Sequence, residues 1–476
     1  MHYFMIRSSA AAVVLALLGG CANLAPDYRQ PDAPVPATLG NADGYAGKAI
    51  DSKWSQDNTL EDQRWRQVFT DPALQAVIAQ ALANNRDWRM AMLNVEKARA
   101  QYQVVDSARM PSINATGSGT HQRTPGTLTD NGAARIGHQY AAGVGISSFE
   151  LDFFGRVQNL SEAAFRDYMA TTEARQSARL SLIANVANGW YALAAAQQKL
   201  AVARATLASR QETQQLIERR LAAGVAGELE LREAQTQTET AAVDVARYLS
   251  QVQQSRNALQ LLAGSPVDVA SLPDGWQGAA VPGVPAIPAD LPSSALLQRP
   301  DVKQAEQQLR AADANIGAAR AAFFPSITLT ANAGAASTQL NQLFKGGSGT
   351  WLFAPQINLP IFDGGRNQAN LDAAKVDREL AVAGYEKAIQ SGFREVADGL
   401  AQLQGDADQL AAQSRVLAAS QQALKLADAR YQKGVAGYLD VLLAQRSYYG
   451  AQLVQIDLQQ EQAANQISLY KALALY

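Results

Sequence analysis

The strongest constraint on the fold of this chain is an internal duplication. Residues 221–231, LAAGVAGELEL, match residues 431–441, YQKGVAGYLDV, at an offset of 210 positions. Two shorter matches support the same division, namely Gly155-Arg156 with Gly365-Arg366 and Met110-Pro111-Ser112-Ile113 with Phe324-Pro325-Ser326-Ile327. Because self-similarity at a fixed period marks a repeated structural unit, we predict two halves of one architecture. We assign the first repeat to 72–263 and the second to 295–476.

Each half is predicted to contain a helix, a β-hairpin and then two long helices joined by a short turn. The segments 156–222 and 366–433 contain no proline. A helix over the 67 residues of 156–222 would be about 100 Å long at a rise of ~1.5 Å per residue. The segments 228–262 and 438–474 are predicted to return antiparallel to these helices, because a Gly-Val-Ala-Gly sequence ends each long helix in a turn.

The long helices are predicted to pack side by side along heptad seams. In the second repeat, apolar positions recur every seven residues, at Leu403, Leu410, Leu417, Leu424 and Tyr431. The intervening seam positions are predicted to hold Ala407, Ser414, Gln421 and Asp428. One face of each returning helix is also apolar, through Ala241, Val245, Tyr248, Val252, Leu259 and Leu262 in the first repeat and through Leu439, Leu442, Leu453, Ile456 and Ile467 in the second. This spacing is typical of coiled-coil packing.

The two hairpins, at about 112–152 and 326–361, show strand periodicity instead. Apolar or small residues alternate with polar ones, at Ile113, Ala115, Gly117 and Gly119 in the first repeat and at Ile327, Leu329, Ala331 and Ala333 in the second. Aromatic residues gather at the strand ends, at Tyr140, Phe149, Phe153, Phe154, Phe323, Phe324, Trp351, Phe353 and Phe362. Weak alternation over about ten residues with aromatic ends is typical of transmembrane β-barrel strands. A water-soluble antiparallel sheet with aromatic core residues is the alternative interpretation.

Counting the strands predicts an oligomer. A sheet that spans a membrane must close into a barrel, because an open edge would leave backbone groups without hydrogen bonds in lipid. One chain offers four strands, and bacterial barrels begin at about eight. Two chains would give eight strands and a lumen filled by side chains, whereas three would give twelve strands and room for an aqueous pore.

The N-terminus is predicted to be a lipoprotein signal peptide covering 1–20. Arg7 precedes a short apolar run that ends in Leu18-Gly19-Gly20-Cys21, which resembles a bacterial lipobox. Cys21 is the only cysteine of the chain, and it would become the lipidated first residue of the mature protein. The next residue is Ala22, where an aspartate would retain an enterobacterial lipoprotein at the inner membrane. This favours location in the outer membrane. We predict a lipidated, extended arm over 21–71 and a proline-rich linker over 264–294.

Composition excludes several functional classes. The formal net charge of −2 provides no basic surface for nucleic acid. One cysteine and three scattered histidines, His2, His121 and His138, are too few for a thiolate or histidine metal centre, so no metal or other cofactor is expected. The sequence contains no P-loop, no His-Glu-x-x-His and no Gly-x-Ser-x-Gly motif, so we expect no enzymatic activity.

Three motifs resemble those of a known family. They are Glu150-Leu-Asp-Phe-Phe-Gly-Arg156, Pro360-Ile-Phe-Asp-Gly-Gly-Arg366, and the segment from Arg430 through Gly434-Val435 to Arg446. Their order within the duplication resembles the outer-membrane efflux protein family, in its TolC-like group and OprM-like lipoprotein branch. The resemblance covers nearly all of the chain after Cys21. It implies a mainly α-helical fold with a β-barrel portion, in which a homotrimer forms a twelve-stranded outer-membrane barrel continuous with a long periplasmic helical barrel.

The resemblance also implies a function and partners. The chain would be the exit duct of a tripartite efflux pump, conducting small toxic molecules or drugs passively to the exterior. It would be opened by a periplasmic adaptor protein that is fed by an inner-membrane pump, of the proton-driven RND type. The turns at Gly224, Val225, Gly434 and Val435 would contact the adaptor.

The same resemblance assigns a periplasmic aperture to Tyr431, Leu439, Leu443 and Arg446. Leu439, Leu443 and Arg446 lie four and three residues apart, so they share one helix face. Threefold symmetry would make each of them a ring, and a leucine ring can close a pore by dewetting. Leu443 stands where this branch often has an acidic residue, which favours a hydrophobic seal. Leu439 and Leu443 could instead belong to a coiled-coil seam, and Arg446 to a solvated face.

Two other functions are compatible with parts of the sequence. A lipid-tethered periplasmic coiled-coil scaffold or adaptor would explain the long helices and Cys21, but not four alternating strands placed at matching positions of the two repeats. An outer-membrane duct for protein secretion or metal efflux would share the predicted fold. Six methionines without a cluster give no support to export of soft metals such as copper or silver.

Overall fold

The computed structural model of the chain describes residues 23–36, 64–130, 132–268, 272–273 and 292–473. The predicted signal peptide, Cys21, and most of the predicted arm and linker lie outside the described residues. The chain forms two compact units. The first combines parts of 1–32, 94–172 and 304–386, and the second combines parts of 33–93, 173–303 and 387–476. Each unit therefore takes segments from both repeats.

The order of elements is the same in the two repeats, as the duplication predicts. In the first repeat, α4 (Arg86–Asp106) is followed by β1 (Ile113–Thr124), β2 (Arg135–Leu151), α5 (Arg156–Ala222) and α6 (Glu228–Ala263). In the second repeat, α7 (Pro300–Ala321) is followed by β3 (Ser326–Ser337), β4 (Gly349–Asn358), α8 (Arg366–Gln432) and α9 (Tyr438–Ala472). Three short 3-10 helices, η3 (Ser107–Arg109), η4 (Gly126–Leu128) and η7 (Leu340–Gln342), lie next to the strands, and η6 (Ser293–Gln298) precedes α7.

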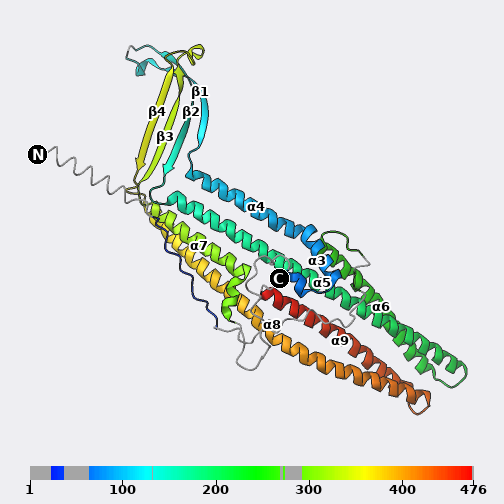
Figure 1. Cartoon of the computed structure of the whole chain (residues 1–476). Helices are drawn as coiled ribbons and strands as arrows, with labels where there is room; N and C mark the ends of the chain where they lie inside the picture. The colour runs from blue at the N-terminus through cyan, green and yellow to red at the C-terminus, as the bar shows by residue number, and fades with distance from the viewer. Residues whose placement is uncertain (1–22, 37–63, 131, 269–271, 274–291, 474–476) are drawn as a thin grey trace. The chain divides into compact units, whose positions relative to one another are not determined.

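The first unit contains one antiparallel sheet with the strand order β1-β2-β3-β4 (Figure 1). The two hairpins pair through β2 and β3, so the repeats join within one sheet. Strands β1 and β4 form its two edges. A register shift between Ile146 and Phe149 in β2 accommodates Ser148, whose φ is 53° and whose N–H donates to Thr330 Oγ1 at 3.2 Å.

The predicted alternation places the apolar residues on one face of the sheet. Ile113 lies opposite Ile146, and Ile327 lies opposite Ile357. On this face six large apolar side chains are more than half exposed in the single chain, at Ile113, Ile136, Val144, Trp351, Phe353 and Ile357. So large an exposed apolar surface marks a site that meets lipid or another protein.

Two aspartates bind the backbone N–H groups at the start of the long helices. Each lies in one of the two Gly-Arg motifs that precede these helices. Asp152 accepts hydrogen bonds from the backbone N–H groups of Arg156 and Gln158, both at 2.7 Å. Asp363 accepts from the N–H groups of Gly365 and Asn367 at 2.9 and 2.8 Å. A carboxylate at this position satisfies N–H groups that have no partner within the helix and opposes the helix dipole. The matching motifs therefore encode the change from strand to helix.

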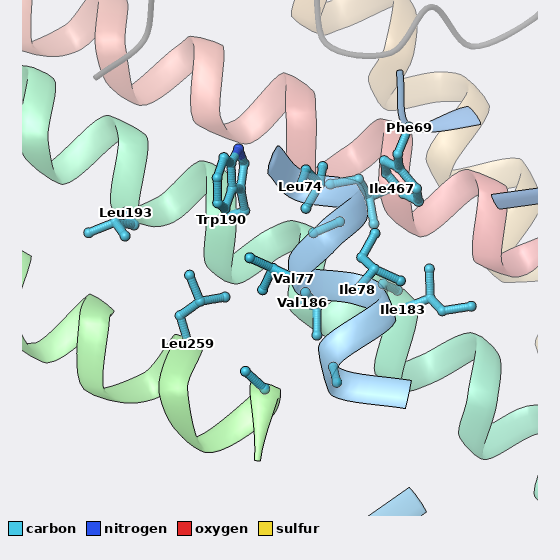
Figure 2. Packing of buried hydrophobic residues seen from close by; sticks show 14 of the residues in the cluster. Phe69, Leu74, Val77, Ile78, Ile183, Val186, Trp190, Leu193, Leu259 and Ile467 are labelled. Atoms are coloured by element: carbon cyan, nitrogen blue, oxygen red, sulfur yellow. The ribbon is translucent and has the colours of Figure 1, made fainter. Parts of the chain in front are cut away.

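The core of the second unit lies where α3 (Pro72–Asn84) packs against the long helices. Leu74 and Ile78 of α3 belong to one buried cluster with Ile183 and Trp190 of α5, Leu259 of α6 and Ile467 of α9 (Figure 2). Burying side chains of this size stabilises the unit by about 1.5–3 kcal/mol each. Asp71 caps the N-terminus of α3, and its carboxylate accepts a hydrogen bond from the N–H of Ala73 at 2.8 Å.

The end of the predicted extended arm is helical. Residues Arg64–Val68 form α2, and the side chains of Trp65 and Phe69 are 2% and 0% exposed within the same core. The prediction of an extended arm up to residue 71 is therefore wrong at its end. Proline density identified the arm, but Trp65, Val68 and Phe69 provide apolar surface whose burial outweighs the cost of ordering a short helix.

The heptad seam of α8 differs from its prediction in one respect. The four intervening residues predicted to face the seam, Ala407, Ser414, Gln421 and Asp428, are exposed. Each leucine is instead followed three residues later by an inward-facing side chain. Gln413 donates to the carbonyl of Ala451 at 2.9 Å, and the carboxylate of Asp406 accepts from Asn465 at 3.1 Å. Spacings of three and four both fit a heptad, and only packing against α9 selects one of them.

Within the described part of the chain, no helix is both long enough and apolar enough to cross a membrane.

Candidate functional site

The two turns between the long helices have one geometry. Gly224 and Gly434 have φ values of 74° and 71°, in the left-handed region. The N–H of Val225 donates to the carbonyl of Arg220 at 2.9 Å, and the N–H of Val435 donates to that of Arg430 at 2.9 Å. These bonds form a Schellman motif, which requires the left-handed residue. Both valines are exposed, at 64% and 68%, so each turn presents an apolar side chain.

Tyr431 does not lie with the other predicted aperture residues. Its side chain is 9% exposed and belongs to a small core with Ile217, Ala234, Tyr438 and Val441. Leu439 and Leu443 are each 57% exposed, and Arg446 is exposed on the same helix face. The predicted set of four residues therefore divides into one buried tyrosine and one exposed face of α9.

The phenol of Tyr431 connects the two repeats. Its hydroxyl donates to Glu230 Oε1 of α6 at 3.3 Å, and Arg220 of α5 lies over its ring at 5.0 Å. Burial and the nearby Glu230 carboxylate raise the pKa of Tyr431. The neighbouring ring of Tyr438 is 5.6 Å away, and burial raises the pKa of Tyr438 to about 12. Both phenols are thus neutral hydrogen-bond donors at physiological pH.

A second polar cluster lies further along the same helices and was not predicted from sequence. Tyr449 donates to Asp244 Oδ2 at 2.9 Å, and Arg247 pairs with Asp244 Oδ1 at 2.8 Å. Arg210, which is 6% exposed, lies over the Tyr449 ring at 5.7 Å and donates to the carbonyl of Gln237 at 2.8 Å. Burial lowers the pKa of Arg210 and raises that of Tyr449.

The two histidines of the sheet are not scattered as predicted. His121 of β1 lies directly opposite His138 of β2, and their Nδ1 atoms are 3.2 Å apart. Seventeen positions separate them in the sequence, but the hairpin register brings them together. The described residues contain no group of three or more histidine, cysteine, aspartate or glutamate side chains that could hold a metal ion.

The fold and its surfaces define a class of protein. A duplicated chain with a four-stranded sheet that exposes one apolar face, and two pairs of long helices that end in matched turns, is the architecture of TolC-like outer-membrane channels. The sequence model of the Outer membrane efflux protein family matches residues 77–265 and 291–475. The chain belongs to this family, as the motifs predicted.

Known relatives align with this chain over nearly its full length. The toluene efflux pump outer membrane protein TtgC of Pseudomonas putida is 43% identical over 464 residues, covering 97% of this chain and 94% of TtgC. The cation efflux system protein CusC of Escherichia coli is 42% identical over 465 residues, covering 97% and 96%. The open-state crystal structure of the Neisseria gonorrhoeae MtrE outer membrane channel has a TM-score of 0.83 and 38% identity, covering 95% of this chain and 98% of that one.

A crystal structure of CusC has a TM-score of 0.84 and 41% identity, and covers 95% of this chain and 99% of that one. The chain is therefore an outer-membrane channel protein of an efflux system, with a large periplasmic part and the role of an exit duct. It is a transport protein rather than an enzyme.

Proposed function

We propose that the chain assembles as a homotrimer whose twelve strands close into one barrel. The sheet carries the proposal, because it has two edge strands, β1 and β4, and one face of exposed apolar side chains. Edges left open in lipid would lose several kcal/mol for each backbone group without a hydrogen bond. Pairing β1 of one copy with β4 of the next removes every edge, and three copies leave a lumen wide enough for water. The apolar side chains of the exposed face would then contact lipid, and the hairpin end of the same face, with His121 and Arg123, would lie at the membrane surface.

The long helices of three copies would form the periplasmic tunnel, with the matched turns at its tip. The exposed Leu439, Leu443 and Arg446 would line the aperture as three rings, and the buried Tyr431 would brace it through Glu230. Leucine rings close a narrow pore by excluding water, and the arginine ring would filter ions by charge. The absence of an acid at position 443 favours a hydrophobic seal.

The exposed turns at Gly224-Val225 and Gly434-Val435 would dock the helical hairpins of a periplasmic adaptor protein. The two apolar tips have the same backbone geometry, so one kind of adaptor hairpin fits both. The adaptor would link the duct to an inner-membrane pump, of the proton-driven RND type. Lipidation of Cys21 would add an anchor in the outer membrane to the one that the barrel provides.

The cargo would be small toxic molecules or drugs that pass through the open duct without energy input at this step. Relatives with nearly equal identity carry names that refer to toluene, antibiotics and cations, so the duct itself does not select among these classes. Metal efflux and protein secretion remain the alternatives for the same fold. A lipid-tethered scaffold would leave the exposed apolar face of the sheet without a role.

The first experiment is the detergent-corrected mass of the protein extracted from separated inner and outer membranes. A particle of three chains from the outer membrane supports the proposal, and planar-bilayer conductance then reports whether the aperture is sealed. A monomer, or a protein confined to the inner membrane, would overturn the barrel and support the tethered scaffold instead.

A further inference from the structure

We propose that His121 and His138 form a binding site for a divalent transition-metal ion near the end of the β1–β2 hairpin. The two residues are direct cross-strand partners, and both are exposed on the face of the sheet that also carries Ile136 and Val144. The inference goes beyond the efflux function and does not depend on it, because it uses only the hairpin register and two imidazole rings.

The spacing of the two nitrogens fits a shared ion. The Nδ1 atoms share a hydrogen bond at 3.2 Å, and the rings meet edge to face at 85° with their centroids 4.6 Å apart. An ion held at about 2.1 Å from each nitrogen would subtend an angle of about 100° between them. That angle lies between the octahedral and tetrahedral values. Rotation about χ2, a broad torsion in histidine, lets both lone pairs converge on the ion.

Tyr140 supplies the outer support that metal-binding histidines usually have. The hydroxyl of Tyr140 lies 3.0 Å from Nε2 of His121. Tyr140 follows His138 by two residues, so both side chains lie on the same face of β2. In the tautomer that carries a proton on Nε2, His121 donates to Tyr140 Oη and presents Nδ1 toward His138, where the ion would replace the hydrogen bond between the two rings.

The ligand type selects the kind of ion. Neutral imidazole favours Zn²⁺, Cu²⁺ and Ni²⁺, whereas Ca²⁺ and Mg²⁺ require oxygen ligands. Two protein nitrogens leave the other coordination positions to water. Arg123 lies two residues beyond His121 on the same face, and its positive charge weakens the binding of a cation. The site is therefore a reversible one that responds to the metal in the surrounding medium.

The test is a Cu²⁺ titration of the assembled full chain in detergent, with any purification tag free of histidine. Electron paramagnetic resonance should show one Cu²⁺ per chain with hyperfine coupling to two imidazole nitrogens. His121→Gln or His138→Gln should leave one coupled nitrogen and weaken the apparent affinity by about tenfold or more. Tyr140→Phe should keep both nitrogens but weaken binding, and Arg123→Gln should strengthen it.

Gln139→Ala is the matched control, because Gln139 lies between His138 and Tyr140 but on the opposite face of β2. It should leave the titration unchanged. Particle mass by size exclusion verifies that each variant assembles. The proposal is overturned if the double His→Gln variant binds Cu²⁺ as the natural protein does, or if the natural protein binds two ions per chain with one nitrogen each.

Discussion

The hydroxyl of Tyr431 lies 3.3 Å from the carboxylate of Glu230, and 201 residues separate the two in the sequence. The contact joins α8 of the second repeat to α6 of the first, close to both turns. Arg220 over the same ring brings α5 into the cluster. Three long helices are therefore tied at one tyrosine, so a change there affects how closely the ends of the helices pack.

Replacing Tyr431 with phenylalanine should loosen the tip without unfolding the chain. The ring and its packing remain, and only a long hydrogen bond to a carboxylate is lost, which costs about 1 kcal/mol. If the contact forms only in the closed state of the proposed aperture, a loss of that size would shift the aperture about fivefold toward its open form. Single-channel conductance of the assembled protein in planar bilayers measures the shift.

The matched control for Tyr431→Phe is Glu228→Gln. Glu228 also lies in the first turn of α6, but its partner is Arg232 on the exposed surface of the same helix. An exposed pair of this kind contributes about 0.5 kcal/mol or less. Equal conductance changes in both variants would show that loss of any polar contact at the tip, rather than the Tyr431–Glu230 contact in particular, shifts the aperture.

Alkaline pH should destabilise the core around Tyr438. Burial raises the pKa of Tyr438 from 10.0 to about 12, so the unfolded chain releases this proton first as the pH rises. The stabilisation is complete below pH 10 and is lost between pH 10 and about 12, by up to about 1.4 kcal/mol per pH unit. The free energy of unfolding in urea should fall less steeply over this range in Tyr438→Phe. Parallel pH profiles for the two proteins would contradict the assignment.

The sequence predicted the long elements well because their signals are local and repeated. Proline-free segments 156–222 and 366–433 became α5 and α8 to within one residue, and glycines ended both where a left-handed residue was needed. Alternation also placed the strands, and pairing of Ile113 with Ile146 confirmed the common apolar face. Helix periodicity and turn chemistry are encoded in neighbouring residues, so they can be read without tertiary contacts.

What the sequence did not predict depended on partners that are distant along the chain. A leucine heptad cannot show whether the third or the fourth residue faces inward, and α9 decides this through Asn465 and Ala451. The same holds for Tyr431, which was grouped with Leu439 but is buried against the first repeat. His121 and His138 meet only because the hairpin register pairs them.

Gly434→Ala should destabilise the turn through backbone strain alone. A Cβ at Gly434 would meet no atom within 4 Å, so the φ of 71° is the only feature of this position that disfavours a side chain. A residue with a side chain pays roughly 1–2 kcal/mol in this region. Gly437→Ala is the control, because Gly437 has the ordinary φ of −76° and also has open space around it. The free energies of unfolding of the two variants in urea should differ by about 1 kcal/mol. Equal losses of stability would show that the positive φ of Gly434 does not disfavour alanine.

Cys21→Ala should remove the lipid but not the assembly. The proposed barrel of twelve strands would hold the protein in the membrane by its own apolar face, so the variant should remain a trimer in the outer-membrane fraction. Mass spectrometry of the N-terminal peptide should show acyl chains in the natural protein and none in the variant. Release of the variant as a soluble periplasmic monomer would contradict the proposed barrel.

Serine at both Leu439 and Leu443 should make the closed channel leak. Each side chain is 57% exposed in the single chain, so folding should change by no more than about 0.5 kcal/mol per site. Water should then enter the proposed leucine rings, because the hydroxyl supplies hydrogen bonds that leucine cannot. Conductance of the resting trimer should rise, and cells carrying the variant should become sensitive to large antibiotics. Leu426→Ser, at a similarly exposed leucine of α8, is the control and should leave conductance unchanged. A correctly assembled double variant with natural conductance would place the seal elsewhere.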